Sequence, residues 1–198
     1  MDIDNNQNNI GKEEVYKYDK KNFFRKEIFE WLKSIAFAVV IAILIKTFLF
    51  NTTYVLGYSM YPTLHERDRL FTNKIAYRIS DPKPGDIVVL KAPDDPDKDY
   101  IKRVIGIEGD TVVIMDGKVY VNGEIYKEYY ISEDSYTHSY ENSSWKVGKG
   151  YLFVLGDNRN KGASKDSRYL GLITMDSIKG KATYRYFPID SRFGSLYK

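Results

Sequence analysis

YIKRVIGIEGDTVVIMDGKVYVNG, residues 100–123, consists of three short apolar runs separated by turn-forming residues. The runs are rich in Val, Ile and Tyr and show the period-two pattern that favours β-strands. Asp116-Gly117 and Asn122-Gly123 are dipeptides typical of two-residue hairpin turns. The stretch therefore predicts consecutive antiparallel strands at residues 100–107, 111–115 and 118–121.

Similar runs extend this pattern through the body of the chain: DIVVL (86–90), YLFVL (151–155) and IKGKATYRYF (178–187). No amphipathic helical stripe appears after residue 50, and residues 127–150 form a polar, aromatic and irregular excursion. We expect residues 51–198 to be mainly β, as a folded antiparallel sheet or a partly open barrel.

The first 50 residues have a different composition. Residues 1–27 are mostly polar, which predicts a disordered tail. Residues 28–50 include the apolar run IAFAVVIAILI and are long enough as an α-helix to cross a bilayer, which predicts one transmembrane anchor. A buried helix and a cleavable signal peptide are the alternatives, but FLFNTTY offers no small-x-small cleavage site.

Basic residues around this apolar segment predict its orientation. No Lys or Arg follows Lys46 until Arg67. Those that precede the apolar run are Lys20, Lys21, Arg25, Lys26 and Lys33. The positive-inside rule then places the N-terminus in the cytoplasm and the β body outside, as a single-pass protein of the cell membrane in contact with lipid.

The composition excludes several classes of site and partner. The absence of Cys rules out disulfides, cysteine zinc sites and thiol nucleophiles. With only two histidines, His65 and His138, we expect no metal site. The 30 basic residues exceed the 27 acidic ones by a net charge of +3, which argues against a nucleic-acid partner.

Two segments carry side chains suited to nucleophilic catalysis. In LGYSMYPTL (56–64), Ser59 lies between Gly57 and Pro62. An isolated serine of this kind is ordinarily a turn former, and a serine nucleophile needs a base. In YIKRVIGIEGD (100–110), strand alternation predicts that one of two cations points towards the buried side. A buried lysine loses charge and can act as a general base, whereas a Lys-Arg pair at an exposed sheet edge is the alternative.

A third segment, GDNRNKGASKDSR (156–168), follows an apolar strand and is dense in loop-forming residues. Its charged and amide side chains are expected to brace the loop through a network. The residues of this expected network are Asp157, Asn158, Arg159, Asp166 and Arg168.

Taken together, SMYPTL, PGDIVVL, YIKRVIGIEGD and GDNR…SKDSR resemble the motifs of type I signal peptidases, in the Gram-positive-like form with one N-terminal anchor. The resemblance covers about residues 30–190. It implies a membrane-bound serine endopeptidase that removes signal peptides from secreted preproteins. It also implies cleavage after small-X-small sites of the Ala-X-Ala kind, by a Ser/Lys dyad without a cofactor.

The resemblance also implies residue roles. Ser59 matches the nucleophile, and Lys102 matches its general base. Met60 would shape the substrate cleft, and the backbone N–H of Ser59 would bind the oxyanion. Gly57 stands where some relatives carry a supporting serine hydroxyl.

Ser164 matches a serine that positions the lysine amine, Arg103 a structural cation, and Asp166 with Arg168 a bracing ion pair. The sequence departs from the family pattern at two places. Residues 160–165 are longer than the family pattern by two residues, with Ala163 where Asn is usual. Arg67 replaces a usual glycine, which we expect to alter a turn.

Three other functions remain as alternatives. One is a membrane-anchored assembly factor on a signal-peptidase-like fold, which loss of the serine or the lysine would mark; both are present. Another is a self-cleaving Ser/Lys repressor, which would need a DNA-binding helical domain in place of the apolar segment. The third is an anchored β-domain that binds a ligand.

Overall fold

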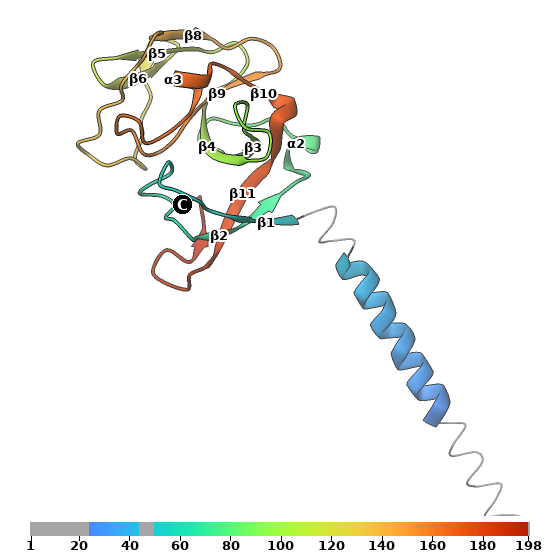
Figure 1. The fold of residues 1–198 in the computed structure, drawn as a ribbon. Coiled ribbons are helices and arrows are strands. Elements are labelled where there is room, and N and C mark those ends of the chain that lie inside the picture. The colour runs from blue at the N-terminus through green and yellow to red at the C-terminus, as the bar shows by residue number, and fades with distance from the viewer. Residues whose placement is uncertain (1–23, 44–49, 198) are drawn as a thin grey trace, which may run out of the picture. The chain divides into compact units, whose positions relative to one another are not determined.

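The computed structural model describes residues 24–43 and 50–197. The chain divides into two compact units, Met1–Thr47 and Phe48–Lys198. Residues 24–43 form an α-helix in the first unit, and the second consists of short strands joined by loops (Figure 1).

The N-terminal helix is charged in its first half and apolar in its second half. Its charged side chains are Arg25, Lys26, Glu27, Glu30 and Lys33. Within the described ranges, 24–43 and 50–197, no helix is both long and apolar enough to span a membrane. Charged side chains are costly in a bilayer. The predicted anchor at 28–50 also extends into residues 44–49, outside the described ranges, so the structure does not support the predicted transmembrane helix.

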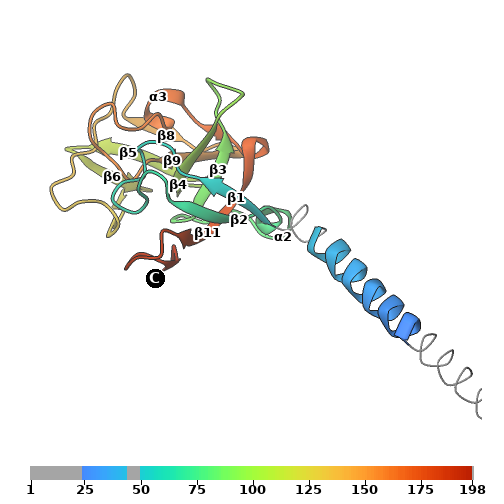
Figure 2. The same ribbon diagram turned by 60° about the horizontal axis from the view of Figure 1, so that its bottom comes forward.

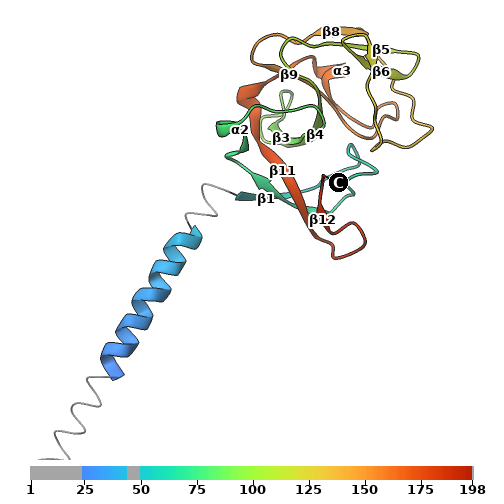
Figure 3. The same ribbon diagram turned by 180° about the vertical axis from the view of Figure 1, so that it is seen from behind.

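The larger sheet of the described chain has eight strands, in the order β1-β2-β11-β3-β4-β9-β10, with β12 paired to β11. All of its paired neighbours are antiparallel. Figure 2 shows β11 beside β2, and Figure 3 shows β12 near the end of β11. The strands are β1 (Phe50–Tyr54), β2 (Arg69–Asn73), β3 (Ile87–Lys91), β4 (Asp99–Gly106), β9 (Tyr151–Leu155), β10 (Ile173–Thr174), β11 (Ile178–Phe187) and β12 (Gly194–Ser195).

The smaller sheet has the order β7-β6-β5-β8 in the described chain. Its strands are β5 (Thr111–Met115), β6 (Lys118–Val121), β7 (Glu124–Ile125) and β8 (Ser144–Lys146). Both predicted hairpin turns are present, because Asp116, Gly117, Asn122 and Gly123 have φ angles of 50°, 74°, 55° and 86°. These positive angles at both central residues are those of a type I′ turn.

The expected mainly β, antiparallel body is therefore confirmed. β5, β6, β9 and β11 have the bounds that the sequence predicted, and β3 and β4 differ by one residue. Helix is confined in this unit to three short segments of the described chain. They are α2 (Ala76–Ile79), α3 (Ser167–Leu170) and the 3₁₀ turn η1 (Met175–Ser177).

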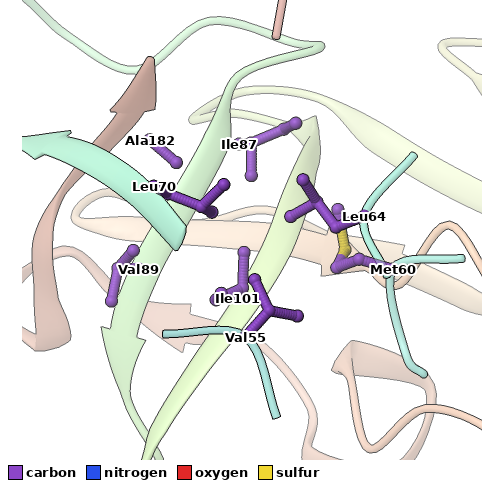
Figure 4. Packing of buried hydrophobic residues seen from close by; sticks show 8 residues of the cluster. All are labelled: Val55, Met60, Leu64, Leu70, Ile87, Val89, Ile101 and Ala182. Atoms are coloured by element: carbon purple, nitrogen blue, oxygen red, sulfur yellow. The ribbon is translucent and has the colours of Figure 1, made fainter. Parts of the chain in front are cut away.

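One core cluster fixes the loop that joins β1 and β2. Val55, Met60 and Leu64 of this loop are at most 3% exposed and pack against side chains of β3 and β4 (Figure 4). The remaining members of this cluster are Leu70, Ile87, Val89, Ile101 and Ala182. Because burial of each large apolar side chain contributes about 1.5–3 kcal/mol, the loop is held firmly against the sheet.

Candidate active site

Ser59 and Lys102 lie 43 positions apart in the sequence and meet in the structure. The Nζ atom of Lys102 donates a hydrogen bond of 3.0 Å to Ser59 Oγ. It donates a second one of 2.9 Å to the carbonyl oxygen of Ile101. β4 supplies the lysine, and the packed loop between β1 and β2 supplies the serine.

The Lys102 amine is in an environment that favours its neutral form. The residue is 3% exposed. Desolvation by burial lowers the pKa of Lys102 to about 8, although the charges of Asp166 and Asp157 act in the opposite direction. A neutral amine within hydrogen-bond distance of a hydroxyl can take its proton.

Arg103 is also buried, at 5% exposure, so β4 carries a buried cation on each face. The sequence predicted only that one of the two would face inwards. Arg103 pairs with Asp157 through Nε at 2.9 Å and Nη2 at 2.6 Å, and Thr63 Oγ1 donates to the same carboxylate at 2.5 Å. This buried ion pair joins β4 to the loop after β9 and to the serine loop.

Asp166 and Arg168 form a second buried ion pair. The Nε and Nη2 atoms of Arg168 donate to the carboxylate at 2.8 and 2.7 Å, and the Gly156 N–H donates at 3.0 Å. Burial alone would raise the pKa of Asp166, but the hydrogen bonds and charge of Arg168 outweigh it and lower that pKa. The carboxylate therefore stays charged and holds the 156–168 loop together.

Gly156 lies between two residues of the site. A Cβ atom at this position would approach Ser164 Oγ to 2.3 Å and the backbone oxygen of Ser59 to 2.4 Å. Only glycine allows this close approach. The sequence offered no sign of this role. Ser59 belongs to a loop far away in the sequence, and Ser164 lies eight residues after Gly156 in the same loop.

Ser164 is buried, and its hydroxyl makes no well-formed hydrogen bond within the described ranges. It lies near enough to Asp166 to contribute to the lowered pKa of that carboxylate. The hydrogen bonds of the Lys102 amine go instead to Ser59 and Ile101. Ser164 therefore lies near the backbone of the serine loop, since its Oγ and the Ser59 backbone oxygen would both be close to a Cβ at Gly156.

The residues that flank the serine differ in exposure. Met60 is 2% exposed and points into the core beside Leu64 (Figure 4). Gly57 has a φ of 80°, and a Cβ there would meet nothing within 4 Å.

Asn158 fixes this segment, because its backbone N–H donates to Ser59 O at 3.0 Å and its Nδ2 donates to Tyr58 O at 3.0 Å.

Arg159 binds residues that the sequence did not single out. Its Nε donates to Gly156 O at 2.9 Å, its Nη1 donates to Thr137 Oγ1 at 2.8 Å, and both terminal nitrogens donate to the Glu128 carboxylate. Glu128 and Thr137 belong to the excursion at 127–150. Nothing in the sequence pairs them with Arg159, because only the tertiary structure brings the segments together.

No group of His, Asp or Glu within the described ranges is arranged to hold a metal ion. His65 contributes a backbone N–H to Asp68 at 2.8 Å, and His138 contributes its carbonyl oxygen to Arg168 at 3.4 Å. The basic side chain that contacts Ser59 is therefore Lys102, and not a histidine.

Comparison with known proteins places this chain in a family. Residues 28–187 match the family described as signal peptidase, peptidase S26. The chain is 40% identical over 179 residues to signal peptidase I of Bacillus amyloliquefaciens, with 86% of this chain and 94% of the relative covered. It is 40% identical over 175 residues to signal peptidase I S of Bacillus subtilis strain 168, with 84% and 92% covered.

A crystal structure of a signal peptidase I from Enterococcus faecalis V583 shares 34% identity with the chain at a TM-score of 0.44. The alignment covers 52% of this chain and 97% of the Enterococcus faecalis chain. Because the family model matches most of this chain, the chain belongs to the signal peptidases of the peptidase S26 family and is a signal peptidase I enzyme.

Proposed function

We propose that this signal peptidase cleaves secreted preproteins as a serine endopeptidase, with Ser59 as nucleophile and Lys102 as general base. The separation of 3.0 Å between Ser59 Oγ and the buried Lys102 Nζ carries the proposal. A serine hydroxyl is a weak nucleophile at neutral pH and needs a base within hydrogen-bond reach.

The mechanism begins when neutral Lys102 takes the hydroxyl proton of Ser59 and Oγ attacks the scissile carbonyl carbon. The oxyanion that forms accepts a hydrogen bond from the backbone N–H of Ser59, a kind of contact worth roughly 3–4 kcal/mol in serine proteases. The lysine ammonium then gives its proton to the leaving amine as the C–N bond breaks. Lys102 next takes a proton from water, and the hydroxide attacks the acyl-enzyme ester. The acid product leaves as Ser59 regains its proton.

The register of β4 suggests where the substrate binds. On one side, Asp99 to Arg103 pair with β3. On the other side, β9 pairs with Arg103, Val104 and Gly106. Within the described chain, Asp99 to Lys102 therefore have a free edge on that side. A preprotein segment can add to this edge as an extended strand, which brings its scissile bond beside the dyad.

Small-X-small specificity is part of the same proposal. The family resemblance implies Ala-X-Ala-like sites, and an added strand points alternate side chains towards the enzyme. Two small side chains separated by one residue match this period.

We also propose attachment to the cell membrane through the segment that precedes the β body, with the N-terminus in the cytoplasm. The apolar second half of the 24–43 helix and the basic residues Arg25 and Lys26 before it support this orientation. Protease treatment of intact and of opened membrane vesicles tests it. The β body should be digested only from the outer side, and equal digestion from either side would contradict the proposal.

The dyad is tested by cleavage of a purified preprotein with an Ala-X-Ala site. The full-length, detergent-solubilised protein is compared with Ser59→Ala, Lys102→Ala and the exposed loop variant Ser132→Ala. Product masses are read by mass spectrometry. We expect cleavage after the small-X-small site, with kcat/KM reduced by more than about a thousandfold in both dyad variants and unchanged in Ser132→Ala.

Cleavage that survives either dyad substitution would contradict the mechanism. A folded wild-type protein that cuts none of several preproteins would favour an assembly factor instead.

A further inference from the structure

A surface ion pair joins two loops near the dyad. The loop before β4 carries Asp94, and the loop after β9 carries Lys165 within the stretch that is longer than in the family pattern. Lys165 Nζ lies 2.8 Å from Asp94 Oδ2, with side-chain exposures of 60% and 25%. An exposed pair of this kind contributes little to stability.

Asp94 also contacts a residue that lies against the lysine of the dyad. Its carboxylate lies near enough to the Tyr100 hydroxyl to help raise the pKa of Tyr100, after the larger effect of burial. The Lys102 Nζ lies 5.0 Å from the centroid of the Tyr100 ring. Tyr100 and Lys102 are two positions apart in β4 and share one face of the sheet. A continuous series of contacts thus runs from Lys165 through Asp94 and Tyr100 to Lys102.

This series acts electrostatically on the amine. The face of an aromatic ring attracts a cation, and a nearby carboxylate does the same. The charged side chains with the largest effects on the pKa of Lys102 are, in decreasing order, Asp166, Asp157, Arg168 and Asp94. The first three are buried, with Asp166 and Asp157 in tight ion pairs, whereas Asp94 lies near the surface with Lys165 as its counterion.

We propose that Asp94, paired with Lys165 and lying against the Tyr100 side chain, is a positioning residue that helps to hold the Tyr100 ring beside the Lys102 amine and favours the protonated form of that amine. Lys165 neutralises part of the Asp94 charge and so opposes its effect. The inference rests on the proposed role of Lys102 as base.

The two ends of the ion pair are expected to act with opposite sign. Asp94→Asn removes a negative charge that favours the ammonium, so the acid limb of the kcat/KM profile moves to lower pH. Lys165→Met leaves the Asp94 charge without its counterion, so the limb moves to higher pH. The double variant, Asp94→Asn with Lys165→Met, resembles Asp94→Asn alone.

The experiment measures kcat/KM against pH at low ionic strength for the full-length enzyme and these variants. Asp95→Asn is the matched control for the acidic residue, because Asp95 lies in the same loop and pairs with Lys98 at 2.5 Å. Lys161→Met is the matched control for Lys165, because Lys161 is exposed in the same loop. Raising the salt concentration should shrink both shifts, since screening weakens exposed charges.

A second readout does not depend on activity. Competitive acetylation of Lys102 with acetic anhydride, followed by mass spectrometry against pH, reports the protonation of its amine directly. Opposite displacements in Asp94→Asn and Lys165→Met support the inference. Displacements of the same sign, or none beyond those of the two controls, overturn it. If Lys102→Ala keeps activity, the proposed dyad fails, and the acetylation shifts still decide the role of Asp94.

Discussion

The Lys102 Nζ lies 3.0 Å from Ser59 Oγ, and the lysine is 3% exposed. In the proposed mechanism this contact provides the path for the serine proton, and burial lowers the pKa of Lys102 to about 8, which favours the neutral amine that would accept it. The same burial makes the charged lysine unfavourable for the fold. Activity and stability should therefore depend on the protonation of one amine.

Activity should fall as the pH falls through the pKa of Lys102. Since the pKa is lowered to about 8, the amine is mostly protonated below that pH and cannot take the serine proton. We expect kcat/KM to rise about tenfold per pH unit below the pKa and to level off above it. Initial rates on a preprotein, measured at several pH values on both sides of pH 8, test this. A profile that is flat across that range would rule out a lysine base with this pKa.

Lys102→Met should raise the free energy of unfolding at neutral pH. In the wild type, folding lowers the pKa of Lys102 from its ordinary value of 10.5 to about 8, so between these limits the unfolded chain holds a proton that the folded chain lacks. Wild-type stability therefore rises with pH in this window, and below it the buried charge lowers stability by about 3 kcal/mol.

A methionine at position 102 does not titrate, so the variant lacks this dependence of stability on pH. In urea unfolding, Lys102→Met should have a larger free energy of unfolding than wild type at pH 7. This difference should shrink as the pH rises towards 10.5. A Lys102→Met protein that is less stable than wild type at neutral pH would contradict the expectation.

Gly156→Ala should damage the site more than a typical glycine substitution. The new Cβ would come within 2.4 Å of the Ser59 backbone oxygen, so the serine loop must move away from Lys102. We expect a loss of about 1–3 kcal/mol in stability and a large loss of kcat. Gly148→Ala is the control, because its Cβ would meet only Tyr151 at 4.0 Å. Similar activities for the two variants would show that the serine loop can adjust.

Arg67→Gly should stabilise the protein. Arg67 has a φ of 70°, in the left-handed region, where a side chain other than glycine costs roughly 1–2 kcal/mol. Glycine also gives the unfolded chain more conformational freedom, which leaves a net gain of about 0.5–1 kcal/mol. Arg69→Gly in β2 should instead lower stability, because strand backbone does not need glycine. Thermal unfolding measures both, and a lower Tm for Arg67→Gly would contradict the prediction.

The sequence predicted those parts of the fold that depend on local patterns. β5 and β6 have their predicted bounds, because alternating apolar residues and Asp-Gly or Asn-Gly turns act over neighbouring positions. β8, Ser144–Lys146, lies in the stretch expected to be irregular. Only three residues form it, and its pairing with β5 depends on a partner about 30 positions away.

Four motifs in family order were sufficient to single out Ser59 and Lys102 and to predict the family, because each motif is a short run of neighbouring residues that can be recognised in the sequence. Tertiary structure alone decided that their atoms meet, that both β4 cations are buried, and that Glu128 pairs with Arg159. It also decided that Gly156 lies against the serine loop. The physical reason is that desolvation and ion pairing depend on which distant segments pack together, whereas strand period and turn geometry are fixed by adjacent residues.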